Sequence, residues 1–108
     1  MEIPLKLTIQ GLEYSDPLEK RIRDQVESLE KSCSRIERCR VAVEFHQKRA
    51  HDRKRYTVEI DVTLPGHAII VTKDRDEDVY VALRDAIDGV RKELDQWIRK
   101  GKGPEKIP

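Results

Sequence analysis

The spacing of apolar residues changes period several times along the chain, and these changes limit the folds that it can adopt. Over residues 3–9 apolar and polar residues alternate, which is typical of a strand with one buried face. Over residues 18–33 apolar residues recur every three or four positions, as on a helix with one apolar side. The same two patterns predict three further strands and a second helix, at 41–45, 56–64, 68–72 and 76–100. The predicted order of elements is therefore β-α-β-β-β-α.

Residues that begin or interrupt secondary structure stand between these segments. Asp16 is followed by Pro17 at the first helical position and by Glu19 three residues later, an arrangement that predicts a capped helix start. We expect this helix to end near Ser34. Pro65-Gly66 interrupts the alternating pattern and predicts the turn of a hairpin.

The order of elements predicts an α+β fold in two layers. Because the first helix connects two consecutive strands, these strands are expected to be parallel and the later ones antiparallel. Each helix has one apolar side, so both helices are expected on one face of a four-stranded mixed sheet. A chain of 108 residues has room for one such domain, predicted over 1–100, with a flexible basic tail at 101–108.

The other face of the predicted sheet is left to water. Its expected residues are polar or charged, namely Lys6, Thr8, Gln10, Glu44, Glu59, Asp61 and Thr63. Since none of them is aromatic, this face does not provide a platform on which RNA bases could stack.

Positive charge is concentrated in parts of the sequence. In total 22 Lys and Arg face 21 Asp and Glu, which excludes a uniformly basic coat for nucleic acid. Residues 31–55 nevertheless hold nine Lys and Arg against three Asp and Glu, and a predicted loop within them contains Lys48, Arg49, Arg53, Lys54 and Arg55. A second group lies in and just after the last helix, at Arg91, Lys92, Arg99, Lys100 and Lys102.

Each basic group has two interpretations. The loop is either a phosphate clamp or a solvated turn that keeps a strand pair from aggregating. The cations of the last helix suit the negative end of the helix dipole, and they can also pair with Asp88 and Asp95. Two separate basic patches on an almost neutral protein favour contact with a folded, extended polyanion over a catalytic pocket.

The residues give no support to catalysis or to a bound metal. The sequence has no P-loop and no Gly-x-Ser-x-Gly motif. Its three histidines and two cysteines lack the close spacing of a tetrahedral metal site, so no metal or other cofactor is expected. Cys33 and Cys39 are expected to be small buried hydrophobes in a reducing cytosol. No apolar stretch approaches membrane length and no signal-peptide pattern is present, so we expect a cytoplasmic protein without a membrane partner.

The second helical segment carries the motif D-x-Y-x-A-[IL], whose residues here are Asp78, Tyr80 and Ala82, followed by Val90-Arg91-Lys92-Glu93-Leu94. With this motif the chain resembles the ribosome hibernation promoting factors, also called ribosome-associated inhibitors or sigma-54 modulation proteins. The resemblance extends over residues 5–100 and implies a fold similar in topology to double-stranded-RNA-binding domains. It also implies a non-enzymatic translation inhibitor that binds rRNA of the small ribosomal subunit near the A and P sites of the mRNA channel.

The resemblance further implies which side chains contact rRNA. The cations that match basic positions of the family are Arg21, Arg23, Lys31, Arg91, Lys92, Arg99 and Lys100. Some short members carry lysine where this chain has Ser28, Gly89 and Gln96, and we expect the basic loop with Lys48, Arg49, Arg53, Lys54 and Arg55 to compensate. The protein is expected to be a monomer off the ribosome, with no DNA partner. The three departures leave an alternative open, a stress-related protein-interaction regulator that has kept the fold and lost most rRNA affinity.

Overall fold

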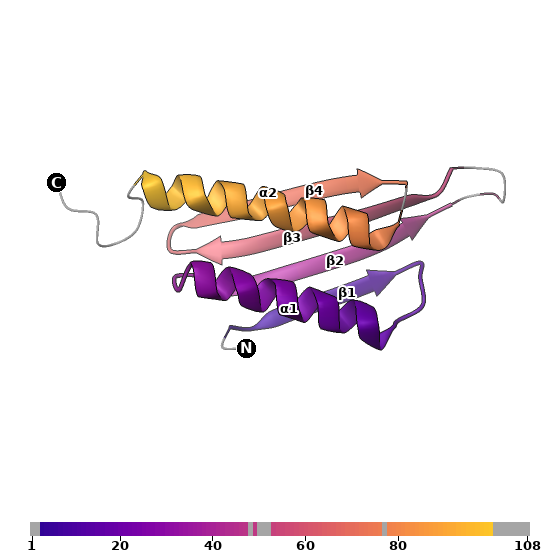
Figure 1. Cartoon of the computed structure of the whole chain (residues 1–108), viewed down its shortest axis with the longest axis horizontal. Helices are drawn as coiled ribbons and strands as arrows, with labels where there is room; N and C mark the ends of the chain where they lie inside the picture. Colours follow the sequence, from indigo (N-terminus) through magenta and orange to yellow (C-terminus); the bar gives the residue numbers. More distant parts are fainter. Residues whose placement is uncertain (1–2, 48, 50–52, 77, 101–108) are drawn as a thin grey trace.

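The computed structural model describes residues 3–47, 49, 53–76 and 78–100. Its elements follow the predicted order, with the bounds β1 Leu5–Gln10, α1 Asp16–Ser32, β2 Arg38–His46, β3 Arg55–Leu64, β4 His67–Arg75 and α2 Val79–Arg99. Figure 1 shows α1 and α2 side by side on one face of the sheet, both starting from the same end of the molecule. The tail predicted at 101–108 lies outside the described residues.

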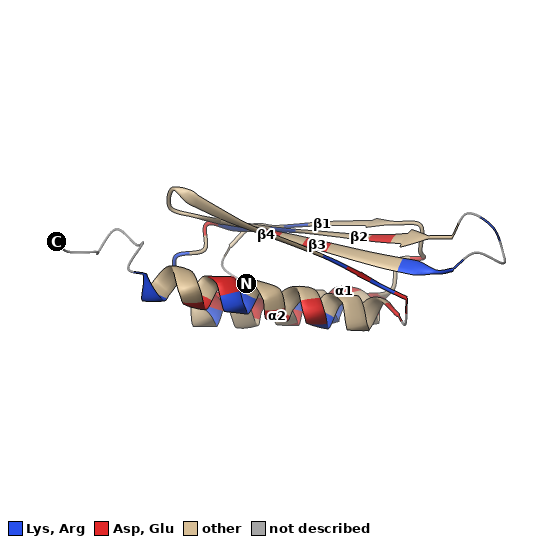
Figure 2. Cartoon of the chain, turned by 90° about the horizontal axis from the view of Figure 1, so that it is seen from above, with Lys and Arg blue, Asp and Glu red and all other residues tan. Residues whose placement is uncertain are grey.

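The strands form one mixed sheet in the order β1-β2-β3-β4. β1 and β2 are parallel, with Leu5 opposite Cys39. The other neighbouring pairs are antiparallel, and β3 and β4 close as a hairpin in which Leu64 pairs with His67 across the Pro65-Gly66 turn. Seen from above, the sheet is one layer and the two helices are the other (Figure 2). The predicted α+β fold is therefore confirmed.

The start of α1 differs from the prediction by one residue. Ser15, and not Asp16, is the N-cap, because the Ser15 Oγ accepts a hydrogen bond of 3.2 Å from the backbone N–H of Leu18. Glu19 consequently stands one position too far along the chain to complete a capping box. It pairs instead with Arg23, four residues later, at 2.8 Å.

The start of α2 also lies later than predicted. Asp78 is the N-cap, and its Oδ1 accepts hydrogen bonds from the backbone N–H groups of Tyr80 at 2.7 Å and Val81 at 3.0 Å. The helix begins directly after this residue rather than within the acidic run. Asp76 of that run accepts a hydrogen bond of 2.7 Å from Arg53 instead.

One apolar core lies between the sheet and the helices. Burial of a large apolar side chain contributes about 1.5–3 kcal/mol to folding, so the two helical stripes hold the layers together. Cys33 and Cys39 are free thiols buried in this core, as predicted. Burial raises the pKa of the Cys39 thiol to about 12, which keeps it neutral at physiological pH. The stripe of α1 consists of Leu18, Ile22, Val26 and Leu29, and that of α2 of Val79, Ala82, Leu83, Ala86, Ile87, Val90, Leu94 and Trp97.

The face of the sheet away from the helices is open and polar. By the alternation of the strands, all seven residues predicted for this face lie on it. Arg40 and Asp61 face each other across β2 and β3 and form an ion pair of 3.0 Å. Phe45 and Tyr56, the aromatic residues of these strands, share the alternation of the buried residues and pack with ring centroids 5.0 Å apart. Within the described strands, the open face carries no Phe, Tyr or Trp.

Gly11, after the end of β1, is a position at which a larger residue is expected to destabilise the fold. Its φ is +83°, and a Cβ there would lie 2.5 Å from the carbonyl oxygen of Phe45. Gly11→Ala should therefore lower the free energy of unfolding by about 2 kcal/mol in urea titrations. Gly66→Ala is the matched control: φ is +65°, but a Cβ would meet no atom within 4 Å, so only the backbone cost of about 1 kcal/mol applies. Equal losses in the two variants would contradict the role of the Phe45 contact.

Candidate nucleic-acid interface

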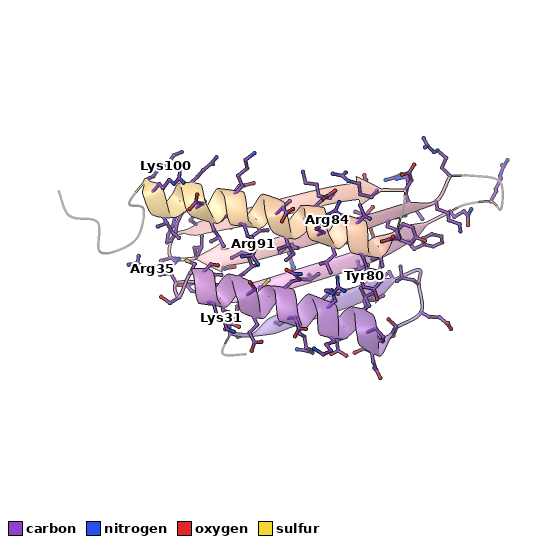
Figure 3. All side chains as sticks on the ribbon, in the orientation of Figure 1. Lys31, Arg35, Tyr80, Arg84, Arg91 and Lys100 are labelled. Atoms are coloured by element: carbon purple, nitrogen blue, oxygen red, sulfur yellow. The ribbon has the colours of Figure 1, made fainter. Side chains whose placement is uncertain are left out.

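Two rows of side chains face each other where α1 and α2 lie side by side. On α2 they recur at intervals of four and seven residues, which places them on one side of the helix. Figure 3 shows these α2 side chains, with Lys31 and Arg35 near the end of α1. We call the following six residues the inter-helix seam: Arg21, Ser28 and Ser32 of α1, and Tyr80, Arg84 and Arg91 of α2.

Contacts across the seam fix the position of two guanidinium groups. The Arg21 guanidinium carbon lies 5.3 Å from the centroid of the Tyr80 ring, a cation–π contact. Arg91 Nη2 donates a hydrogen bond of 2.6 Å to Ser28 Oγ, and Nη1 donates a longer one of 3.5 Å to Ser32 Oγ. Because neither a ring nor a hydroxyl carries a negative charge, both arginines are positioned without being neutralised.

The carboxylates near the seam compensate its charge only in part. Within the described part of the chain, Arg21, Arg91 and Lys31 form no ion pair with a carboxylate. Arg84 Nε lies 3.3 Å from Asp85 Oδ1, but the other oxygen of Asp85 accepts a hydrogen bond of 2.7 Å from Arg75 of β4. The hydrogen bond from Arg75, with a smaller contribution from Arg84, holds the pKa of the Asp85 carboxyl below its usual value. One carboxylate is thus shared between two cations, and positive charge remains along the seam.

The predicted RNA-binding cations divide into those on the layer of helices and those elsewhere. Arg99 belongs to this layer but pairs with Asp95 at 3.0 Å. Arg23 turns toward the β1 side of α1, where it lines a hollow with Leu7 and pairs with Glu19 at 2.8 Å. The predicted cations that lie on or at the end of the helices without a described carboxylate partner are Arg21, Lys31, Arg91, Lys92 and Lys100.

The basic loop between β2 and β3 is separate from the last turn of α2. β2 ends and β3 begins at the end of the molecule where both helices begin, as Figures 1 and 2 show. The 21 residues of α2 span about 32 Å at about 1.5 Å per residue. Arg53 and Arg55 therefore lie at the opposite end of the fold from Arg99 and Lys100, whereas Arg91 lies between these ends, in the seam.

Carboxylates of the β4–α2 segment reach part of the basic loop. Arg53 pairs with Asp76 at 2.7 Å and Arg55 with Asp74 at 3.4 Å. A hydrogen bond from Thr57, and then the charge of Arg55, hold the pKa of the Asp74 carboxyl below its usual value. Arg49 and Lys54 are exposed, and the predicted site residue Lys48 lies outside the described residues.

Arg84, a residue of the seam, and Arg35, beyond the end of α1, are two cations that were not predicted as site residues from the sequence. Arg84 shows a usable signal, because it lies four residues after Tyr80 and seven before Arg91 and so belongs to the same side of a helix. Arg35 lies beyond the end of α1, where helical spacing gives no information. Figure 3 shows it, with Lys31, at the end of α1.

Sequence comparison identifies a family for this chain. Residues 5–102 match the sequence model of the family described as Sigma 54 modulation protein / S30EA ribosomal protein. The chain belongs to this family. This agrees with the resemblance carried by the Asp78, Tyr80 and Ala82 motif. A search of curated proteins finds no match.

Two solved structures share the fold seen in this family member. A ribosomal subunit interface protein from Coxiella burnetii superposes with a TM-score of 0.76 at 16% identity, covering 90% of this chain and 99% of that one. The N-terminal domain of Protein Y from Thermus thermophilus gives a TM-score of 0.72 at 21% identity, covering 88% of this chain and 99% of that one. These likenesses show the fold.

The motif residues of this family member have identifiable structural roles at the start of α2. Asp78 caps the helix, and Ala82 is fully buried, in the layer between helix and sheet. Tyr80, 38% exposed, carries the Arg21 guanidinium over its ring. The motif therefore fixes where α2 begins and how its first turn meets α1.

The three departures from the basic pattern of the family lie at different places. Ser28 is in the seam and accepts the hydrogen bond from Arg91. Gly89 faces β4, where a Cβ would lie 2.9 Å from a methyl carbon of Val71, so its small size lets α2 approach the sheet. Gln96 lies beside the β3–β4 turn. Two of the three missing lysines would thus stand away from the seam.

Two further observations concern the described residues alone. Neither of the described helices combines the length and apolar character needed to cross a membrane. No group of three or more His, Cys, Asp or Glu side chains in 3–47, 49, 53–76 and 78–100 is arranged to hold a metal ion.

Proposed function

We propose that this protein is a non-enzymatic hibernation factor of the cytoplasm, which binds rRNA of the small ribosomal subunit near the A and P sites of the mRNA channel and inhibits translation. Membership of the family supports this proposal at the level of ribosome association. The observation that carries its RNA-binding part is the seam, where Arg21 and Arg91 are held in place without a described carboxylate partner. In the proposal, residues 1–100 act as one domain that is monomeric off the ribosome.

The seam suits the backbone of folded RNA better than its bases. Guanidinium groups on two parallel helices match phosphate oxygens, and Arg donates two parallel hydrogen bonds to such a group. Phosphate contacts position a protein without reading sequence, so the shape of the rRNA-lined channel would select the binding place. Arg21, Arg84 and Arg91 would form the centre of the interface, with Lys31, Lys92 and Lys100 extending it. Arg23 and Arg99, which are paired, and the basic loop would contribute less.

A protein-interaction regulator with the same fold is the second candidate. The lysine losses at Ser28, Gly89 and Gln96 favour it, because they reduce the charge available for RNA. Gly89 faces β4 and Gln96 lies beside the β3–β4 turn, however. The absence of lysine at these two positions therefore leaves the charge of the seam unchanged. We therefore favour rRNA binding.

Co-sedimentation with small ribosomal subunits tests the proposal. We expect the full chain to sediment with the subunits at 50 mM salt and to dissociate as salt rises. For about four neutralised phosphates, the association constant should fall on the order of 10²-fold between 50 and 200 mM salt, because each contact releases counterions. Protein that remains at the top of the gradient at 50 mM salt would contradict the proposal. A protein partner bound with almost no salt dependence, together with no RNA affinity, would select the regulator instead.

A further inference from the structure

A group of cations lies on the open face of the sheet, on the side of the molecule away from the seam. Lys6 of β1 stands opposite Arg40 of β2 in the parallel register. Arg38 lies two residues before Arg40 on β2, so the alternation of the strand places both on this face. Neighbouring strands are about 4.8 Å apart, and every second residue of a strand recurs after about 6–7 Å. The three side chains therefore start from one small patch, and we call Lys6, Arg38 and Arg40 the sheet-face cluster.

Carboxylates compensate the charge of this cluster only in part. Asp61 of β3 pairs with Arg40 at 3.0 Å. Lys6 and Arg38 are exposed, and neither forms an ion pair or a side-chain hydrogen bond within the described part of the chain. Like charges directly opposite each other on a sheet destabilise it, so the placement of Lys6 beside Arg40 is unfavourable for folding alone. Two positive charges thus remain that the folded chain does not neutralise.

The cluster borders a hollow of about 420 Å³ at the start of β1 and β2. Thr63, opposite Arg38 across β2 and β3, also lines it and adds a hydroxyl donor. Among the described residues that line the hollow, Asp61 is the one carboxylate, and it is bound to Arg40. Guanidinium and ammonium groups donate charge-assisted hydrogen bonds to phosphate oxygens. The side chains of this hollow therefore suit an anion that carries several oxygens.

The cluster occupies only one end of the open face. Glu44, Glu59 and Asp74 lie further along the strands on the same face, toward the end where the helices begin. An anionic strand laid along the sheet would be attracted at the cluster and repelled by these carboxylates. The charge pattern therefore limits the contact to a short stretch, about two phosphate groups for Lys6 and Arg38.

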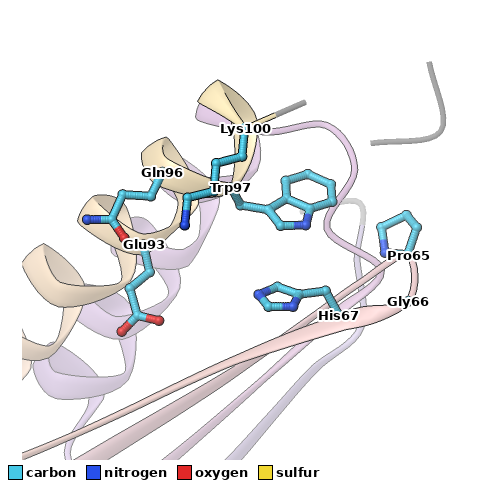
Figure 4. A pocket seen from close by; sticks show the side chains of 7 residues that line it. All are labelled: Pro65, Gly66, His67, Glu93, Gln96, Trp97 and Lys100. Carbon is cyan, nitrogen blue, oxygen red and sulfur yellow. The ribbon is translucent and has the colours of Figure 1, made fainter. Parts of the chain in front are cut away.

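Cations of the helix layer lie at the same end of the molecule. Figure 1 shows that β1 and β2 start where α1 and α2 finish. Lys31 and Lys100 stand at these helix ends (Figure 3). Figure 4 shows Lys100 and the β3–β4 turn, which follows Thr63, around one hollow beside the last turn of α2. Positive side chains are thus present on both layers at this end.

We propose that the sheet-face cluster binds the phosphodiester backbone of a second RNA strand, so that the domain lies between two RNA strands, one at the seam and one at the sheet. The inference rests on the proposed function for the strand at the seam. An RNA backbone suits the cluster better than an acidic protein does, because cations at the same end of the helix layer continue toward the seam. The open face carries no aromatic side chain within the described strands, which fits backbone contact without base stacking.

The variant Lys6→Glu/Arg38→Glu tests the cluster in the full chain. We expect its affinity for small ribosomal subunits to fall on the order of tenfold or more near 150 mM salt, with a salt slope shallower by about 2. Arg53→Glu/Arg55→Glu changes the net charge equally at the other end of the sheet and should lose only a few-fold. The proposal is overturned when Lys6→Glu/Arg38→Glu binds like the unaltered chain or like this control.

Urea unfolding of the same variant separates binding from folding. The carboxylate introduced at position 6 stands opposite Arg40, where it replaces a repulsion by an attraction. We therefore expect an unfolding midpoint at least as high as that of the unaltered chain. A lower midpoint would show that the cations support the fold, and it would contradict their assignment to a ligand.

A second titration distinguishes failure of this inference from failure of the proposed function. It measures binding of a labelled single-stranded RNA, at about 50 mM salt, to the seam variant Arg21→Glu/Arg91→Glu with and without Lys6→Glu/Arg38→Glu. Binding that is lost only in the fourfold variant supports the cluster, even when the unaltered chain ignores ribosomal subunits and the proposed function fails. Equal RNA binding by the two variants overturns the inference alone. A polyglutamate peptide that binds the cluster more tightly than the RNA would assign it to an acidic protein and would also overturn the proposal.

Discussion

Reversal of charge at both Arg21 and Arg91, in the variant Arg21→Glu/Arg91→Glu, is expected to lower the affinity for small ribosomal subunits on the order of 10²-fold or more near 150 mM salt. Each arginine contributes one seam cation, one from each helix. A reversed residue loses its phosphate contact and also repels the phosphate. The plot of log affinity against log salt should become shallower by about 2, one unit for each lost contact. Quantitative sedimentation at several salt concentrations gives both values.

The substitutions should leave the fold intact. Arg21 and Arg91 are not core residues, and the contacts that they lose are one cation–π contact and two hydrogen bonds to serine. We expect a stability loss of about 1–2 kcal/mol from these contacts, which urea titration can separate from the binding effect. A sedimentation loss in a folded variant then reports the interface itself.

Arg53→Glu/Arg55→Glu is the charge-matched control. It changes the net charge by the same amount, but the two side chains stand in the basic loop, paired with Asp76 and Asp74. Because these pairs already offset part of the charge, we expect only a few-fold loss of affinity. A larger loss in this variant than in Arg21→Glu/Arg91→Glu would place the main RNA contact at the loop and contradict the role proposed for the seam.

The strand and helix order could be predicted because each apolar period is interrupted by polar or turn-forming residues. Helix starts were less predictable, since Ser15 and Asp16 are both good caps and only the hydrogen bond to Leu18 distinguishes them. In the same way Asp76 and Asp78 are both acidic residues before an apolar stripe. In the structure Asp78 is the cap, whereas Asp76 accepts a hydrogen bond from Arg53, which is distant in sequence.

The candidate site could be predicted less completely than the fold. Charge counting along the chain singled out the basic loop and the last helix, but it could not show that the loop residues Arg53 and Arg55 lie at the opposite end of the molecule from the last turn of that helix. It also could not show which cations meet a carboxylate, because pairs such as Arg55 with Asp74 join residues 19 positions apart. The seam depends on two helices lying side by side in parallel, a relation that no local pattern contains.

Ile60→Ala is expected to destabilise the protein by about 3–4 kcal/mol, the largest effect that we predict for a single substitution on folding. Ile60 lies in β3, an inner strand of the sheet, and its side chain is 0% exposed under the helices. Truncation removes apolar surface from the core and leaves a cavity, because neighbouring strands cannot move inward without breaking their ladders. Urea unfolding followed by circular dichroism measures the loss.

Ile70→Ala tests whether this loss comes from the core or from the strand itself. Ile70 lies in β4 on the open face, and its side chain is 56% exposed. The same atoms are removed from the same sheet, so any preference of strands for isoleucine is lost in both variants. Only Ile60 also leaves a cavity, and Ile70→Ala should therefore cost less than about 1 kcal/mol. Comparable losses in the two variants would mean that the loss comes from the strand itself, and would contradict the role of the core cavity at Ile60.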